Sequence, residues 1–413
     1  MSTTAAKSFS PPWCAQASCP CVCSRYITAP TSSGVGPPSS LFPPLPTKRD
    51  GTGPETVDRA LIGTTRRVNA RTGMIEFSRL PSNGHSNAPG TPAESVIYRL
   101  DPVRESQTRR LIFQLGTSDP ARAVAAARIV APDVAGIDVN AGCPKPFSTS
   151  GGMGAALLRT PDLLVEILEA LVKEVVPEFG IAVSVKIRLL ETAEETEALV
   201  RRLVRTGIAG LTVHCRTTPM RPRERAIRGQ LRLVGDVCRE AGVACVMNGD
   251  VDGREQAEDL IKEFGVDGAM IATAAEKNPS CFRPGKLAGW EEVARQYVQF
   301  AIEAENKFGN TKFSLQQLIP GREPMCKRII AAKTYTELVE VLGLDDMRDA
   351  AAEVDRALGM EAAKKHKQER KQAETDKKAQ KKRRRDSNDS VQVKRRVLDE
   401  RPAGLSMAAA SAL

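Results

Sequence analysis

The sequence lacks any apolar run long enough to cross a lipid bilayer, so it predicts no transmembrane helix. Regular cysteine spacing is also missing. The ten cysteines of this 413-residue chain follow no framework pattern, which predicts free thiols in a reducing compartment. No acidic residue precedes Asp50, a mild feature of a mitochondrial transit peptide, but the prolines there argue against the amphipathic helix that such peptides need. We therefore expect a cytoplasmic or nuclear protein, with a mitochondrial one as the weaker alternative.

Residues 1–52 are rich in Pro, Ser, Thr and Gly and show no helical or strand period, which is typical of a disordered segment. Arg25 to Pro30 is the only weak strand candidate in it. A cysteine group also lies there, but no second ligand group follows at a fixed spacing, so we predict no metal site. The cysteines of this group are Cys14, Cys19, Cys21 and Cys23.

The chain is basic, with a formal net charge of +10 and a pI near 9.2. This suits a polyanionic partner, and it suits any basic soluble protein equally well. Residues 361–413 contain few apolar side chains and predict a basic tail that is disordered or a single helix. Its run Lys381 to Arg385 is compatible with a nuclear localisation signal, an RNA contact or simple solubility.

From Arg110 onward, short apolar strands alternate with helical patterns, and this predicts a parallel sheet that is covered on both faces. The predicted strands are LIFQLG, VAGIDVN, AVSVKIR, GLTVHC, VACVMNG and DGAMIAT. Asp119-Pro120 and Thr160-Pro161 predict helix starts, each an N-cap followed by proline. Glycines at 207, 242 and 265 predict helix ends. Before this region, residues 57–69 predict a short helix and turn, and Ser95 to Leu100 predicts a small exposed strand.

Polar residues gather at the carboxyl ends of these strands. Because those ends converge on one rim in a barrel, the pattern favours a (βα) barrel with a single site there. A doubly wound nucleotide-binding sheet needs G-x-G-x-x-G after its first strand, and none is present there. Taken alone, Lys186 also suits a strand-end charge that reaches water, and His214 an ordinary hydrogen-bonded histidine. The rim residues are Gln114, Asn140, Lys186, Arg188, His214, Arg216, Asn248, Asp250 and Thr273.

The stretch from Ile137 to Leu158 carries the most specific signal. It begins as an apolar strand and breaks into a Cys-Pro turn and a glycine cluster at Gly151, Gly152 and Gly154, where backbone can approach a ligand closely. A lone cysteine at such a place is usually an ordinary buried one. The string DVNAGCPKPFSTSGGMGAALL, however, closely resembles the active-site segment of the tRNA dihydrouridine synthases. The resemblance implies that Cys143 is the catalytic general acid.

The resemblance runs from about Gly53 to about Gly359 and is closest to the eukaryotic, fungal-like branch that acts on the D-loop uridine numbered 20. It implies an α/β fold: a (βα)8 TIM barrel of the FMN-dependent type, followed by a small all-α domain. From about residue 285, apolar residues recur at helical spacing, as such a domain requires. The expected divisions are residues 1–52 as an atypical N-terminal segment, 53–284 as the barrel, 285–360 as a helical tRNA-binding domain and 361–413 as the tail.

Only six barrel strands are recognisable, so the first two strands of the barrel are apparently missing. We therefore expect an open barrel that lacks one wall of its cofactor site. Either the translated sequence has lost its upstream part, or the chain is not a competent enzyme. Two alternatives to the enzyme stay open: an inactive tRNA-binding protein with a degenerate barrel, and another FMN barrel that acts on a small pyrimidine.

The resemblance also implies cofactors and their contacts. FMN is the expected flavin, and NADPH or NADH reduces it. Lys186 is expected near flavin N1, where reduction places negative charge, and the two strand-end turns are expected to offer N–H groups to the FMN phosphate. Thr273 departs from the family, which often has arginine there. The implied FMN contacts are Gln114, Lys186, His214, Asn248, Gly249, Asp250, Ala272 and Thr273.

The expected substrate is a uridine of tRNA, reduced while it is out of its stack, by a chain that acts as a monomer and needs no membrane. A thiol suits the acid role because a free cysteine, with a pKa of about 8.5, is mostly protonated at neutral pH. An arginine-rich loop follows the rim and predicts either a phosphate track or a solvated loop. The expected substrate-binding residues are Asn140, Arg188, Arg216, Arg221 and Arg223.

Overall fold

The structure is a computed structural model. It describes residues 24–28, 51–52, 55–80, 94–103, 111–360, 376 and 378–380. The chain divides into two units, Met1–Leu358 and Gly359–Leu413, and every element below belongs to the first. No helix in the described part of the chain is long and apolar enough to span a membrane. The predicted basic tail, with Lys381 to Arg385, falls almost entirely outside the described residues and stays a prediction.

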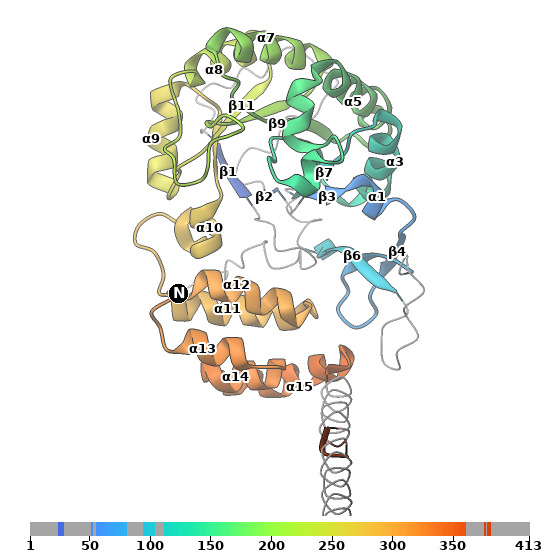
Figure 1. The fold of residues 1–413 in the computed structure, drawn as a ribbon, viewed down its shortest axis with the longest axis vertical. Helices are drawn as coiled ribbons and strands as arrows, with labels where there is room; N and C mark the ends of the chain where they lie inside the picture. The colour runs from blue at the N-terminus through green and yellow to red at the C-terminus, as the bar shows by residue number, and fades with distance from the viewer. Residues whose placement is uncertain are drawn as a thin grey trace, which may run out of the picture. The chain divides into compact units, whose positions relative to one another are not determined.

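All six predicted strands form, and each pairs in parallel with the next along the chain. Their apolar side chains are buried because helices cover the outer face of the sheet and the strands pack on each other inside. Figure 1 shows the sheet enclosed by an arc of helices. The strands are β7 (Leu111–Gly116), β8 (Gly136–Ala141), β9 (Ala182–Arg188), β10 (Gly210–His214), β11 (Ala244–Asn248) and β12 (Gly268–Ile271).

Three short strands that precede β7 complete the sheet: β1 (Ser24–Thr28), β2 (Gly51–Thr52) and β3 (Thr56–Val57). β1 pairs antiparallel with β12 and with β2, and β2 pairs in parallel with β7. The ladder therefore runs from β7 to β12 and back through β1 and β2, so the expected open barrel is wrong. The weak strand candidate at Arg25 to Pro30 is confirmed as β1. Its antiparallel direction differs from the all-parallel order of a regular barrel.

The helices that follow the strands begin and end as their capping residues predict. Asp119 accepts a hydrogen bond from the N–H of Arg122 at 2.8 Å and starts α3. Thr160 is the N-cap of α5 but makes no such bond with its side chain. The predicted glycine ends at 207, 242 and 265 all adopt positive φ angles. The helices are α3 (Pro120–Val130), α5 (Pro161–Glu174), α6 (Val176–Phe179), α7 (Ala193–Leu203), α8 (Leu231–Glu240), α9 (Arg254–Phe264) and α10 (Thr273–Lys277).

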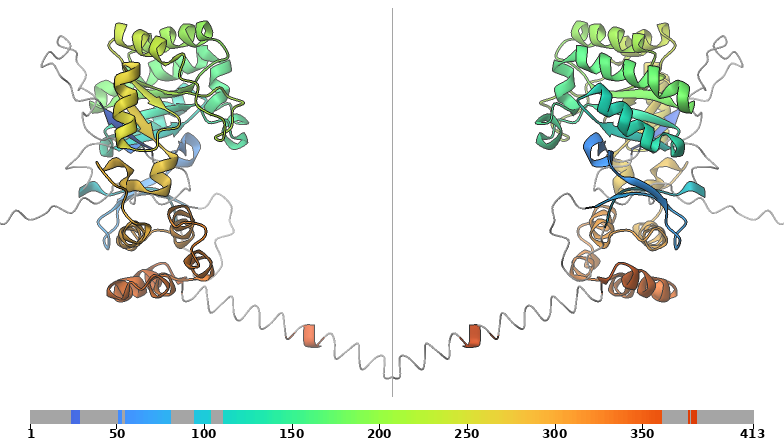
Figure 2. Two further views of the ribbon diagram at one scale, coloured as in Figure 1. Left: turned by 90° about the vertical axis from the view of Figure 1, so that its left-hand side faces the viewer. Right: turned by 90° about the vertical axis from the view of Figure 1, so that its right-hand side faces the viewer.

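A second, antiparallel sheet follows the short helix α1 (Asp58–Leu61) and consists of β4 (Thr65–Val68), β5 (Ile75–Arg79) and β6 (Ser95–Leu100). The predicted short helix and the strand β6 are confirmed, but the predicted turn contains β4. One face of β6 is buried, since the ring of Tyr98 packs edge-on against Phe113 of β7, with the ring centroids 5.0 Å apart. Figure 2 shows this sheet in blue beside the barrel and the C-terminal helices.

The region after the barrel is helical, as predicted. Tyr335 organises it: its buried hydroxyl donates to the carbonyl of Asn306 at 2.7 Å, and its N–H donates to Asp355 at 2.8 Å. The helical pattern at 326–343 forms two helices rather than one because Thr334 caps a new start through Glu337 N–H. The helices are α11 (Trp290–Glu303), α12 (Phe308–Leu318), α13 (Met325–Ala331), α14 (Tyr335–Leu342) and α15 (Arg348–Ala357).

Candidate active site

The strand register brings the predicted rim residues together. Asn140 of β8 lies opposite Lys186 of β9. One step further along the strands, His214 of β10 lies between Arg188 of β9 and Asn248 of β11. Because side chains alternate across a strand, residues an even number apart share one face of the sheet. The predicted rim therefore forms one surface across neighbouring strands.

A buried carboxylate lies below this rim, and the sequence analysis missed it. Asp138 of β8 is fully buried and accepts hydrogen bonds from Gln114 Nε2 at 3.1 Å and from Ser184 Oγ at 2.8 Å. Burial raises the pKa of Asp138, while Ser184, Gln114 and the charge of Lys186 oppose that rise. The available signal was an aspartate in the middle of an otherwise apolar strand. Buried carboxylates are rare unless they are paired.

Lys186 stands next to this carboxylate with its ammonium group available. Burial lowers the pKa of Lys186 to about 8, although the negative charge of Asp138 favours the protonated form. Its Nζ makes no hydrogen bond or ion pair within the described residues. A lysine with a depressed pKa and no partner is typical of a ligand-binding position. It can meet an electron-rich or anionic group that enters the rim.

His214 is held neutral in one tautomer. Burial, with the charges of Lys186, Arg188 and Arg216, lowers the pKa of His214 to about 2. Its Nε2 lies 3.1 Å from Nη1 of Arg216, which can only donate. Nε2 is therefore the acceptor, and Nδ1 carries the hydrogen. The His214 ring thus has one N–H that a ligand can use.

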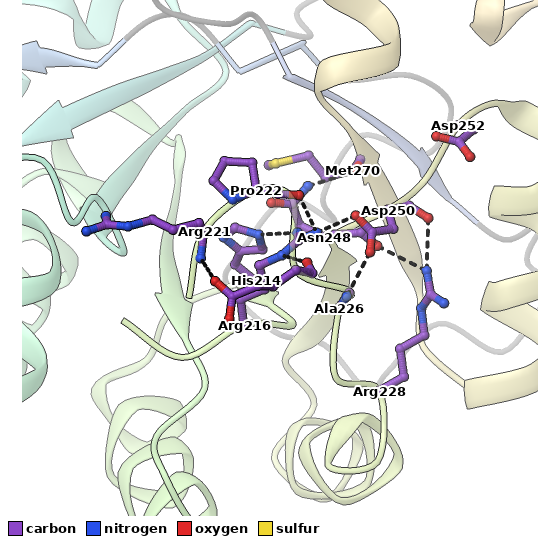
Figure 3. Close-up of polar contacts among 12 residues, drawn as sticks. His214, Arg216, Arg221, Pro222, Ala226, Arg228, Asn248, Asp250, Asp252 and Met270 are labelled. Carbon is purple, nitrogen blue, oxygen red and sulfur yellow. Dashed lines mark hydrogen bonds and ion pairs between the residues drawn. The ribbon is translucent and has the colours of Figure 1, made fainter. Parts of the chain in front are cut away.

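Arg216 is the centre of a buried polar cluster, which Figure 3 shows. Its guanidinium donates to the carbonyl of Glu224 at 2.7 Å and pairs with the carboxylate of Asp250. Asp250 also accepts from the N–H of Ala226 at 2.7 Å. Burial by itself favours a higher pKa for Asp250, but the Ala226 N–H and Arg216 hold this pKa below its usual value. These contacts attach the loop after β10 to the turn after β11.

Arg188 has a similar position. Its Nε donates to the carbonyl of Gly142 at 2.7 Å, and its Nη1 donates to the carbonyl of Thr217 at 2.9 Å. Arg188 and Arg216 are only 7% and 5% exposed, so both guanidinium groups serve chiefly to hold loops. Their predicted contact with substrate gains no support from these bonds and stays a prediction.

The turn after β11 has a strained backbone that suits anion binding. Gly249 and Asp250 have φ angles of 123° and 49°. Arg228 Nη2 donates to the carbonyls of both, at 3.1 and 2.9 Å. Because the peptide bonds are trans, the N–H groups of Asp250 and Val251 point away from Arg228. These two N–H groups are candidates to bind an anion.

The other predicted phosphate contacts behave differently from each other. Asn248 is 7% exposed and uses its amide to donate to the carbonyl of Met270 at 3.0 Å, which ties β11 to β12. Its predicted cofactor contact gains no support from this bond. Ala272 is the N-cap of α10, and Thr273 at the first helical position is exposed. The hydroxyl of Thr273 is thus accessible, as its predicted role requires.

The loop that carries Cys143 is fixed by its neighbours. Asn140 Oδ1 accepts hydrogen bonds from the N–H groups of Gly142 and Cys143, both at 3.0 Å. The carbonyl of Cys143 accepts from Ala155 N–H at 2.9 Å. The short helix α4 (Pro146–Thr149) and the turn Gly154–Arg159 follow. The predicted roles of Asn140 and Cys143 stay predictions, but the contact between them is structural.

The thiol of Cys143 is half-buried and protonated. Burial raises its pKa above the ordinary value, and Glu55 adds to this, while hydrogen bonds from the Lys145 backbone and from Ser148 oppose it. A neutral thiol is a proton donor and not a nucleophile or metal ligand. No cluster of metal-ligating side chains occurs in the part of the chain that the structure describes.

The arginine-rich loop is exposed at the rim, as both readings of it require. Arg221, Arg223 and Arg225 are exposed, while Arg228 is partly buried against the turn after β11. Exposure is compatible with a phosphate track and with a solvated loop, so the predicted substrate contacts of Arg221 and Arg223 stay predictions.

The fold and the rim together define an α/β barrel protein with a protonated thiol and an unpartnered lysine at the carboxyl ends of its strands. A family model described as "Dihydrouridine synthase (Dus)" matches residues 85–396. The chain belongs to the dihydrouridine synthase family.

Named relatives agree with this. A Schizosaccharomyces pombe protein named "tRNA-dihydrouridine(20) synthase [NAD(P)+]" is 45% identical over 308 residues, which cover 73% of this chain and 61% of the relative. The Saccharomyces cerevisiae protein of the same name is 39% identical over 73% of this chain and 78% of its own length. A Proteus vulgaris protein named "tRNA-dihydrouridine synthase B" is 34% identical over 45% of this chain and 56% of its own. This chain thus spans less than two thirds of the fission yeast relative.

Proposed function

We propose that this chain reduces a D-loop uridine of tRNA, the one numbered 20, to 5,6-dihydrouridine, with FMN as cofactor and NADPH or NADH as reductant. The observation that carries the proposal is the arrangement of the rim: the half-buried thiol of Cys143 on a fixed loop, near the unpartnered ammonium of Lys186. The names of the two yeast relatives support the substrate and the nicotinamide cofactor.

The residues of the rim fit FMN in their chemistry. The Lys186 ammonium suits the pyrimidine edge of a flavin, which becomes negative on reduction. The Nδ1–H of His214 and the second amide N–H of Gln114 supply further donors. The N–H groups of Asp250 and Val251 suit a phosphate. Bound FMN supplies the two-electron chemistry that links the nicotinamide to the uracil.

The chain's own residues then hold the base and move a proton. The S–H bond of Cys143 breaks and a C–H bond forms at C5 of the uracil, which leaves a thiolate. Asn140 contributes by fixing the loop through the N–H groups of Gly142 and Cys143. The exposed arginines at 221 and 223 are placed to contact phosphates of the tRNA. We propose a monomer that acts in the cytoplasm, the nucleus or both.

Cys143→Ala tests this function. The variant should keep its flavin and the reduction of that flavin by NADPH, because the thiol does not take part in either. It should lose dihydrouridine formation by about 10²–10⁴-fold, the usual contribution of a positioned general acid. Both are measured on purified protein, by anaerobic absorbance spectroscopy and by nucleoside mass spectrometry of the tRNA.

Cys326→Ala is the matched control, because Cys326 is also a half-buried free cysteine but belongs to α13. It should retain the parent activity. A parent protein that is colourless when soluble and folded contradicts the proposal. So does a Cys143→Ala protein that makes dihydrouridine at the parent rate.

An inactive tRNA-binding protein is the second candidate. The antiparallel direction of β1 favours it, because a regular barrel has a parallel strand at this position. This candidate predicts tRNA binding without flavin absorbance, and the same purified protein therefore decides between the two.

A further inference from the structure

A carboxylate and a hydroxyl reach the Cys143 loop from outside the motif that carries it. Ser148 is fully buried, and its Oγ donates to Oε1 of Glu55 at 3.4 Å. Glu55 precedes β3, which pairs with the end of β7. It is thus 88 positions before Cys143 in the sequence and belongs to none of the predicted strand ends.

Two glycines make room for these groups. A Cβ at position 116 would lie 2.5 Å from Glu55 Oε1, so only glycine leaves space for the carboxylate there. A Cβ at position 154 would lie 2.5 Å from the carbonyl oxygen of Cys143 and 3.1 Å from its Cβ, and closer still to the hydroxyl of Ser148. The hydroxyl and Cys143 therefore face the same small space. Side chains that require this much bare backbone are placed specifically.

The thiol is otherwise surrounded by positive charge. Lys145 lies two residues along the loop, and Lys186 and Arg188 of the neighbouring strand β9 both interact favourably with a negative sulfur. Cations at this distance stabilise the thiolate, and a thiolate cannot donate a proton. A catalytic acid here therefore needs a negative group that opposes its ionisation.

We propose that Glu55 is a positioning residue for Cys143, acting directly and through the Ser148 hydroxyl to keep the thiol protonated and able to donate. The direction of the hydrogen bonds supports this. Because the Ser148 O–H donates to the Glu55 carboxylate, the Ser148 oxygen presents lone pairs to the sulfur and accepts from S–H. The negative charge of Glu55 itself acts in the same direction, since it raises the pKa of Cys143. The role as a donor rests on the proposed function, but the charge state of the thiol does not.

The test measures that charge state without any tRNA. The parent protein and Glu55→Gln are alkylated with iodoacetamide from pH 6 to pH 11 or so, and modification of Cys143 is followed by peptide mass spectrometry. Only the thiolate reacts. We expect the midpoint of the Cys143 alkylation curve to fall by about one pH unit in Glu55→Gln, because a like charge close to a titrating group shifts it by that order. Glu55→Asp, which keeps the charge, should return most of the shift.

Glu276→Gln is the matched control. Glu276 is a partly buried carboxylate on α10 whose charge interacts with Lys145, and it does not contribute to the pKa of Cys143. This variant should keep the parent midpoint. An unchanged midpoint in Glu55→Gln, or an equal shift in Glu276→Gln, overturns the proposal. Circular dichroism confirms that each variant is folded, and Ser148→Ala gives a second route to the same measurement if Glu55→Gln does not fold. In Ser148→Ala the midpoint should change, because the hydroxyl bridge to Glu55 is lost, and an unchanged midpoint there overturns the bridging role.

Activity forms a separate arm. In the active enzyme, the alkaline limb of the pH profile for flavin reoxidation by tRNA should move to lower pH in Glu55→Gln, while reduction of the flavin by NADPH is unchanged. If the alkylation midpoint shifts but no variant makes dihydrouridine, the role of Glu55 holds and the proposed function fails. If dihydrouridine forms but the midpoint does not shift, the proposed function holds and the role of Glu55 fails.

Discussion

Gly154 is the position where one added methyl group should do the most damage to the site. Its φ angle is +58°, and a Cβ there would meet the carbonyl oxygen of Cys143 at 2.5 Å. Real Cβ atoms do not approach backbone oxygen this closely, and the obstacle is backbone rather than the end of a flexible side chain. Gly154→Ala must therefore displace the Cys143 loop.

The magnitude has two parts. A left-handed backbone costs an alanine about 1–2 kcal/mol relative to glycine. Forcing an extra carbon into a packed region costs about 1–3 kcal/mol more. The sum predicts a loss of roughly 2–5 kcal/mol in the free energy of unfolding. Because the thiol moves with its loop, most of the 10²–10⁴-fold contribution of the general acid should be lost as well.

Gly152→Ala separates the two parts. Gly152 has a similar φ angle, +75°, but a Cβ there would meet only the Ser118 side chain, at 3.4 Å. It should therefore lose only the backbone part, about 1–2 kcal/mol, and keep most of its activity. Both variants are compared with the parent by chemical denaturation and by dihydrouridine formation. If Gly154→Ala is no less stable than Gly152→Ala, or if both retain equal activity, the close packing of the Cys143 loop is wrong.

Three further predictions concern charge. Burial lowers the pKa of Lys186 to about 8, so between pH 8 and its unfolded value near 10.4 the unfolded chain binds more protons, and this residue's cost to stability disappears as pH rises. Lys186→Met should therefore stabilise the protein by about 2 kcal/mol at pH 7 and by little at pH 10, as measured by denaturation. The pKa of Asp250 is below its usual value, so its contribution is present above about pH 4 and is lost as pH falls through the lower folded pKa. Asp250→Asn should cost about 2–4 kcal/mol at pH 7, because it leaves the buried Arg216 unpaired, and clearly less at pH 3; an equal cost at both values would contradict this. Deleting residues 361–413 should weaken tRNA binding and reduce the log–log salt slope by about 0.9 for each lost phosphate contact on a duplex region, and an unchanged slope would leave nuclear import or solubility as the role of the tail.

Local chemistry made much of the fold predictable. The strands β7 to β12 are apolar throughout, and Asp119 and the helix-ending glycines act within a few residues of themselves, so a pattern of neighbours was enough to find them. The motif around Cys143 is equally local, because Asn140 holds the N–H groups of the residues that follow it. The split between α13 and α14 was missed because one threonine cap decided it within a continuous apolar pattern.

What the sequence determined by itself was the set of elements, the rim position of the polar residues and the family. Tertiary structure decided which partners they have, because these partners are remote in the chain. β1 and β2 return to β12 and β7 across the sheet and close a ladder that the sequence left open. Arg188 and Arg216 carry charge that suggested substrate, but loops from other strands occupy their guanidinium groups. Asp138 beneath Lys186, and Glu55 beside Cys143, became visible only through contacts between strands, since a buried charge is defined by the groups that the fold packs around it.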